Sequence, residues 1–137
     1  MIIIGLDNGI IIKGKNKKGQ EFIKSRENSW NEYELGYWRK CWNIRSKFID
    51  DFKYNKDEQK IKFSLKDIDK IIDTLAYFLV KDNWEYEGQT STVFSWEEEI
   101  PSIAQAIKNL YDLKEEIYYM DEKITDADID FYFYDSY

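Results

Sequence analysis

Two charged side chains, Glu34 and Arg45, fall where a helix spanning Trp30 to Phe52 would place its apolar face. At about 100° per residue they share one arc with six other residues. These are Trp38, Cys41, Trp42, Phe48, Ile49 and Phe52. A buried guanidinium must find hydrogen-bonding partners, because an unpaired buried charge costs several kcal/mol. The pattern therefore predicts a polar site within an aromatic wall.

In such a helix Glu34 and Arg45 lie about 16 Å apart, at a rise of about 1.5 Å per residue, so they cannot pair directly. Two interpretations of Arg45 stay open. It pairs with an acid on the third predicted helix or the C-terminal strand, or reaches water. Otherwise it meets the charged group of a bound ligand on which Trp38 stacks. The helix carries further candidate binding residues, namely Tyr37, Arg39 and Lys40.

The C-terminal segment is a second candidate site because it interleaves aspartates with tyrosines. Its members are Asp126, Asp128, Asp130 and Asp135, with Tyr132, Tyr134 and Tyr137. Tyrosines can anchor a basic groove of a partner protein while carboxylates steer its approach. A solvated strand face explains the same acids, so both interpretations stay open.

Catalytic chemistry has little support in the sequence. Asp7 and Gly9 follow a short apolar run, superficially like the opening of RNase H-like nucleases and sugar-kinase-type ATPases, but a hairpin turn explains both residues. The chain has no histidine and one cysteine, Cys41. This excludes an internal disulfide, a Cys/His zinc site and an imidazole base. We therefore expect no catalytic residues, no metal site and no cofactor.

The formal charge of -7 is unevenly distributed along the chain. From Glu115 onward the chain is acidic and contains a single basic residue, Lys123. The segment from Lys13 to Arg26, in contrast, is locally basic. This distribution disfavours a plain nucleic-acid binder, since phosphate binding uses a basic surface. No stretch approaches the roughly 20 apolar residues of a membrane span, and no secretory leader is evident, so we expect a cytoplasmic protein.

Periodicity and capping signals predict a single α+β domain over residues 1–137. A hairpin pairs Ile2–Ile4 with Ile10–Ile12 around the turn Asp7–Gly9. Alternation over Asp128–Tyr134 predicts a C-terminal strand with one buried face. The other expected elements are short strands at Glu21–Lys24 and Lys60–Phe63, and helices over Trp30–Phe52, Ile68–Leu79 and from Ser95 past Tyr111. A small antiparallel sheet, formed by the N-terminal hairpin and the C-terminal strand, then packs with three helices.

The segment Glu34–Lys40, followed by Ile44 and Phe48, resembles the Tyr-Trp-Arg-Lys motif helix of short, functionally uncharacterised proteins encoded by tailed bacteriophages. The tail Phe131–Tyr137 is similar to the aromatic, serine-containing C-terminus of those proteins. The resemblance covers about residues 33–137. It implies a small phage gene product that acts on a host system.

The chain departs from that pattern at three positions. Arg45 stands where a histidine is expected, and Asp135 and Tyr137 stand where a small hydroxyl residue and a tryptophan are expected. Any histidine-dependent chemistry of the phage proteins is therefore absent here.

Together these features favour a non-catalytic phage-type protein that inhibits a host factor through its acidic aromatic surface. The expected partner is a host protein or protein–nucleic acid complex with a basic surface, such as an antiviral defence complex that a DNA mimic would occupy. The alternative is a protein that sequesters a nucleotide immune signal between Trp38 and Arg45. A third interpretation is a metal-dependent nuclease-like enzyme. We expect neither direct nucleic-acid binding nor membrane association, and exposed aromatics also allow a homodimer.

Overall fold

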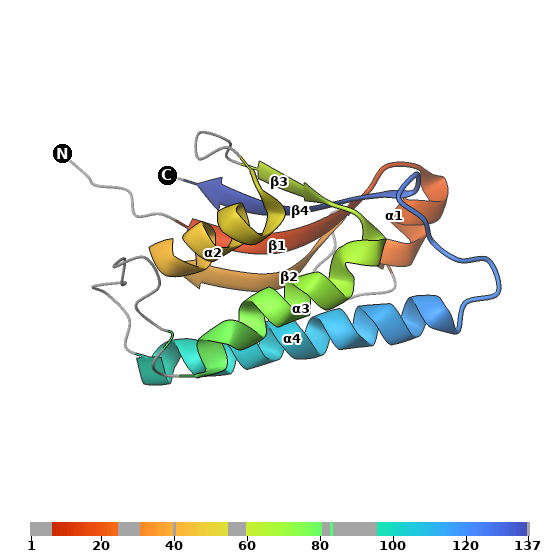
Figure 1. The fold of residues 1–137 in the computed structure, drawn as a ribbon. Helices are drawn as coiled ribbons and strands as arrows, with labels where there is room; N and C mark the ends of the chain where they lie inside the picture. The colour runs from red at the N-terminus through yellow and green to blue at the C-terminus, as the bar shows by residue number, and fades with distance from the viewer. Residues whose placement is uncertain are drawn as a thin grey trace.

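The computed structural model describes residues 7–24, 31–39, 41–54, 60–80, 83 and 96–136. The strands are β1 (Asp7–Gly14), β2 (Glu32–Arg39), β3 (Lys60–Phe63) and β4 (Ile129–Ser136), and the α-helices are α1 (Lys17–Lys24), α2 (Trp42–Phe52), α3 (Ile68–Ala76) and α4 (Trp96–Tyr118). The strands form one antiparallel sheet in the order β2-β1-β4-β3. Helices α2, α3 and α4 lie on one side of it, and α1 lies beside one end of β1 (Figure 1). The α+β class predicted from the sequence is confirmed.

The hydrophobic core lies between the sheet and these helices. In β4, Ile129, Phe131 and Phe133 are buried, whereas the intervening residues are partly exposed, which confirms the predicted alternation. Phe48 of α2 stacks on Phe133 with ring centroids 4.7 Å apart. In β1, Ile10 is also fully buried. The apolar face of the sheet thus meets the apolar faces of the helices.

The segment Trp30–Phe52 is not one helix, so the predicted arc of Glu34 and Arg45 does not exist. Its first part is β2, paired with β1, and only Trp42–Phe52 is helical. The strand prevails because aromatic residues favour a pleated surface and Gly36 disfavours a helix. Gly36 also lets α4 approach, since a Cβ there would lie 2.9 Å from the Cβ of Ala106.

The predicted N-terminal hairpin is also wrong where the structure describes it. Asp7 and Gly9 lie inside β1, opposite Arg39 and Tyr37 of β2, and therefore form no turn. β1 is a central strand that pairs with β2 and β4. The expected first strand, Ile2–Ile4, lies outside the described residues.

The expected strand Glu21–Lys24 belongs instead to α1. Asn16 caps the N-terminus of this helix, because its side-chain oxygen accepts a hydrogen bond from the Gly19 N–H at 2.8 Å. The lysines and glycines of this segment resemble a solvated turn in sequence. The capping asparagine and the buried Phe22 make it a helix.

The remaining predicted elements are confirmed. Strand β3 has the expected bounds, and Ser64 and Asp67 form a capping box before α3, through a 3-10 turn at Leu65–Asp67. A second 3-10 turn, Tyr77–Leu79, extends α3. Helix α4 buries Ile103, Ala106, Leu110 and Leu113, and its expected cap at Ser95 lies outside the described residues. None of the described helices has both the length and the hydropathy that crossing a bilayer requires.

Candidate functional site

The sheet divides the predicted site residues between its two faces. The pairing with β1, in which the register shifts at Leu35, places Glu34 and Tyr37 of β2 on the face opposite α2, α3 and α4, together with three residues of β4. The β4 residues are Asp130, Tyr132 and Tyr134. We call this the outer face, and its cross-strand rows are Glu34-Ile11-Tyr132-Lys62, Tyr37-Gly9-Tyr134-Lys60 and Glu32-Lys13-Asp130. Predicted site residues from β2 and β4, which are far apart in the sequence, therefore lie on the same face of the sheet.

Trp38, Arg45 and Asp135 lie on the inner side. Arg45 Nε of α2 donates to Asp135 Oδ2 of β4, and their side chains are only 10% and 3% exposed. This confirms the interpretation in which Arg45 pairs with an acid on the C-terminal strand. Trp38 is 1% exposed and lies within the core, so its ring cannot stack on a ligand in this conformation. The geometry therefore does not favour a nucleotide pocket built from these residues.

Two of the predicted acids cap turns. Asp128 is buried and accepts hydrogen bonds from Asn16 Nδ2 and the Thr125 N–H, both at 2.9 Å. The Asn16 and Thr125 hydrogen bonds lower the pKa of this carboxyl. Asp126 accepts from Ser64 Oγ at 2.6 Å and from the Leu65 N–H at 2.8 Å. These carboxylates fix the turn before β4 and the start of the 3-10 turn before α3.

Tyr134 lies across the middle of the outer face. A Cβ at Gly9 would come within 2.9 Å of its Cε1 atom, so the ring covers β1 at a position where only glycine fits. The Tyr134 hydroxyl donates to Glu34 Oε2 at 3.3 Å and so links β4 to β2. Burial raises the pKa of Glu34, the hydrogen bond from Tyr134 lowers it, and the nearby Glu32 raises it.

The β3 edge of the outer face is basic. Lys60 Nζ lies 4.3 Å from the centroid of the Tyr132 ring, and Lys62 Nζ lies 3.7 Å from Asp130 Oδ1. Burial, and then the charges of Glu32 and Asp130, raise the pKa of the Tyr132 hydroxyl. The β2 edge carries carboxylates instead, so the charge on the outer face changes sign from one edge of the sheet to the other.

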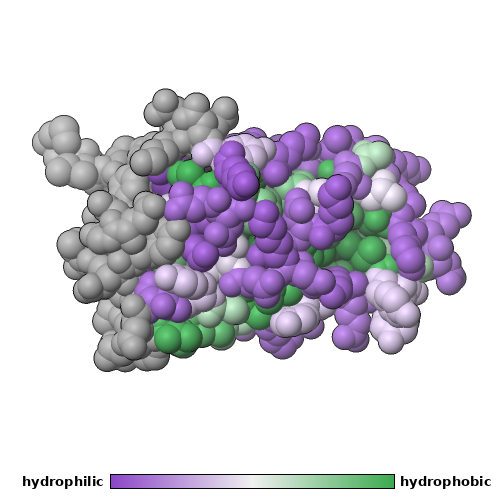
Figure 2. Space-filling model, in the orientation of Figure 1, coloured by the Kyte–Doolittle hydropathy of each residue, from purple (hydrophilic) through white to green (hydrophobic). Residues whose placement is uncertain are grey.

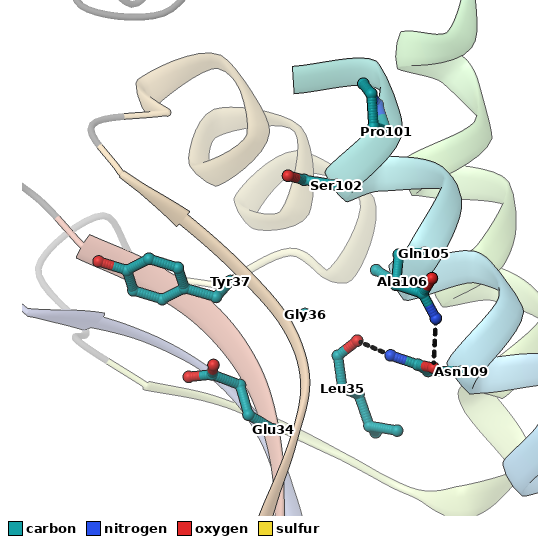
Figure 3. Close-up of a pocket in the computed structure, with 9 residues that line it drawn as sticks. All are labelled: Glu34, Leu35, Gly36, Tyr37, Pro101, Ser102, Gln105, Ala106 and Asn109. Carbon is teal, nitrogen blue, oxygen red and sulfur yellow. Dashed lines mark hydrogen bonds between the residues drawn. The ribbon is translucent and has the colours of Figure 1, made fainter. Parts of the chain in front are cut away.

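A groove of about 350 Å³ adjoins the outer face between the edge strand β2 and α4 (Figure 3). Glu34 and Tyr37 point away from α4, whereas Gln105 and Asn109 of α4 face the strand. Asn109 Nδ2 donates to the Leu35 carbonyl at 2.9 Å, and Asn109 Oδ1 accepts a hydrogen bond from Gln105 Nε2 at 3.0 Å. The register of β1 and β2 shifts beside Leu35, which makes its carbonyl available to α4.

The groove was not predicted from the sequence, because it exists only when β2 is an edge strand that packs beside α4. The polar pair Gln105 and Asn109, four residues apart beside a buried stripe, is the signal that was available. Of the other predicted residues, Arg39 ends β2 at a position paired with Asp7. Lys40 and Tyr137 lie outside the described residues.

The side chains of the outer face and the groove are suited to binding another molecule. Tyrosine rings, carboxylates and amines are close together there, and amide side chains line one wall. Within the described part of the chain, no three His, Cys, Asp or Glu side chains gather as metal ligands. Comparison with models of known protein families, with curated proteins and with solved structures found no match.

Proposed function

We propose that the protein is a non-catalytic binding protein that holds a partner protein on the outer face of its sheet. The observation that supports this most directly is the hydrogen bond from Tyr134 to Glu34 across Gly9. It gathers aromatic and acidic side chains from β2 and β4 on a face that no described helix covers. Tyrosine supplies a large contact area and a polar tip, which suits a protein interface.

The charges of the outer face define the partner further. Glu32 and Glu34 lie along β2, and Lys60 and Lys62 lie along β3. A complementary partner has basic groups above β2 and acidic groups above β3. The net charge of -7 attracts a partner that is basic overall. Because the carboxylates of Asp126, Asp128 and Asp135 are engaged within the protein, Glu32, Glu34 and Asp130 supply the acidic contacts.

The resemblance to short phage proteins supports a bacterial host protein as the partner. A factor that handles nucleic acid in antiviral defence has the required basic surface, since it must bind phosphate groups. Covering that surface inhibits the factor without any catalytic step. The acidic β2 edge and the tyrosines of the outer face are the parts of this protein that make the contact.

The test is affinity capture from a bacterial host lysate with three forms of the tagged chain. They are the wild type, the outer-face variant Glu34→Lys/Asp130→Lys and a control, Asp73→Lys/Glu21→Lys, whose two side chains are exposed on α3 and α1. Both variants change the charge equally. Circular dichroism and thermal unfolding verify that all three fold.

We expect one host protein to be enriched by the wild type and the control, and to be lost from the outer-face variant. The purified complex should dissociate as salt rises, because the contact is partly electrostatic. Capture that survives Glu34→Lys/Asp130→Lys, or that is insensitive to salt, contradicts the proposal. Recovery of a small molecule and no host protein from the wild type also contradicts it.

A further inference from the structure

The outer face is electrically neutral although the chain as a whole is acidic. Its described charged side chains are three carboxylates and three amines, namely Glu32, Glu34, Asp130, Lys13, Lys60 and Lys62. The excess of acid lies elsewhere, as at the exposed Glu115 and Glu116 near the end of α4. Figure 2 shows the molecule from the side of α2 and α3, where hydrophilic side chains predominate. Repulsion between acids outside the outer face is screened at physiological salt, so two outer faces can approach each other.

The cross-strand rows of the outer face are complementary to their own reversed order. The sheet order is β2-β1-β4-β3, so a two-fold axis that runs parallel to the strands between β1 and β4 places β1 over β4 of a second copy, and β2 over β3. Each row then meets the same row in the opposite direction. Sheets that pack face to face keep their strands within about 30° of each other, so the corresponding rows stay close.

The charges at the rim of the outer face match under this rotation. Glu34 on β2 meets Lys62 on β3 of the second copy, and Lys13 on β1 meets Asp130 on β4 of the second copy. Within one chain Glu34 and Lys62 stand at opposite edges of the sheet, about 14 Å apart at about 4.8 Å per strand, so they cannot pair there. The contact of Lys62 with Asp130 in the same chain leaves the Lys62 side chain 67% exposed. Lys62 therefore remains accessible to a second copy.

The apolar and aromatic side chains lie at the centre of the outer face. Ile11 meets Tyr132 of the second copy on each side of the axis. The Tyr134 ring leans over Gly9, next to the axis, so the Tyr134 rings of the two copies pack against each other. An apolar centre with a charged rim is the arrangement typical of protein interfaces.

We propose that the outer face binds the outer face of a second copy in a two-fold symmetric dimer. The two central strands have eight residues each, a length of about 26 Å at about 3.3 Å per residue, and four strands span about 19 Å. The dimer therefore buries about 500 Å² per copy, or about 1,000 Å² in total, at the lower end for specific complexes. Such a dimer forms in the micromolar range and exchanges readily.

The dimer also regulates the site, and this regulation rests on the proposed function. The expected partner has basic groups above β2 and acidic groups above β3, and a second copy presents the same pattern. Self-association therefore covers the outer face until a host protein displaces one copy.

The experiment measures the association of the purified full chain by analytical ultracentrifugation over a range of concentrations. The variants are Glu34→Lys, Lys62→Glu, an equimolar mixture of these two proteins, and the double variant Glu34→Lys/Lys62→Glu. Matched controls are Asp73→Lys and Lys70→Glu, whose side chains are exposed on α3. Circular dichroism and thermal unfolding verify that every variant folds.

We expect a monomer–dimer equilibrium in the wild type and in both controls. Kd should rise at least about tenfold in Glu34→Lys and in Lys62→Glu, because each reversal creates two like-charge contacts in a symmetric dimer. The mixture and the double variant should return to within about threefold of the wild-type Kd, because every new charge then meets its opposite on the other chain.

A wild type that stays monomeric up to about 1 mM overturns the proposal. Single reversals that dimerise as strongly as the wild type, a mixture that stays monomeric, or equal weakening in the α3 controls also overturn it. Capture of a host protein without a dimer overturns this inference and leaves the proposed function intact. A dimer without capture does the reverse.

Discussion

Arg45 on α2 and Asp135 on β4 form a buried ion pair that joins the helical layer to the sheet. Asp135 stands opposite Asn8, which stands opposite Trp38, so the pair continues a buried row across three strands. Burial raises the pKa of Asp135, and the hydrogen bond and charge of Arg45 lower it. Removing both charges from water carries a desolvation cost that their attraction must offset. The contribution of the pair is to fix how α2 lies on the sheet.

Replacing Arg45 with Met should lower the free energy of unfolding by about 3 kcal/mol, because Asp135 then remains as an uncompensated buried charge. The double variant Arg45→Met/Asp135→Leu should recover most of this loss, since it removes both charges. Urea denaturation measures each value. The exposed pair of Lys108 and Asp112 is the control, and Lys108→Met should change stability far less than Arg45→Met, because solvent screens the exposed pair. Equal losses in Arg45→Met and Lys108→Met would contradict the structural role of the buried pair.

That Arg45 pairs with an acid was one of the interpretations that the sequence left open, because a buried guanidinium needs hydrogen-bonding partners and the C-terminal strand offers several acids. The burial pattern of β4 could be predicted from the local sequence. Ile129, Phe131 and Phe133 alternate with polar residues, and this local pattern alone determines which face is buried. The capping box at Ser64 was equally local.

The strand β2 could not be predicted in this way, because its local evidence is divided. Glu34 to Arg39 has an apolar pattern compatible with a helix, whereas its aromatic residues and Gly36 favour a strand. Pairing with β1 and the approach of α4 at Gly36 decide in favour of the strand. The outer face depends on that pairing, since it joins Glu34 to Tyr134 across a hundred residues of sequence. Hydrophobic periodicity predicts which face of a single helix or strand is buried. A site formed by strands that are distant in sequence can be predicted only when their pairing register is known.

Asp128 should make stability depend on pH in the acid range. Its pKa is lowered below the ordinary value of 3.8 in the folded state, so its contribution is fully present above that value. The contribution is lost as pH falls through the folded pKa. Asp128→Asn should therefore lower stability at neutral pH and flatten its decline on acidification, as urea denaturation across the acid range would show. Asn16→Ala, which removes the main cause of the shift, should act in the same direction. An unchanged acid slope in Asp128→Asn would contradict this account.

Gly9 should tolerate no larger residue. A Cβ there would lie 2.6 Å from the Gly36 carbonyl oxygen and 2.9 Å from Tyr134 Cε1. Gly9→Ala should therefore cost about 1–3 kcal/mol and displace the Tyr134 ring from Glu34. Thermal unfolding measures the cost, and the NMR shifts of Tyr134 report the displacement. In a Tyr134→Ala background the cost should fall but remain, because the clash with the backbone persists. A Gly9→Ala protein of full stability, with an unmoved Tyr134, would show that the strands can separate there at no cost.

Lys53 and Asn31 both have positive φ, at 55° and 68°, yet replacement by glycine should affect them differently. Lys53 ends α2 in the left-handed conformation, and its N–H bonds the Ile49 carbonyl. Glycine at such a position relieves about 1–2 kcal/mol of backbone strain in the folded state. It also loses more conformational entropy on folding, which lowers stability by about 0.5–1 kcal/mol. Lys53→Gly should therefore raise the free energy of unfolding by about 0.5–1 kcal/mol. The Asn31 side chain also donates to the Gly14 carbonyl at 3.0 Å, so Asn31→Gly loses a hydrogen bond of about 1 kcal/mol and gains no stability. Urea denaturation of the two variants tests the contrast, and equal stabilisation by both would show that the Asn31 bond contributes nothing.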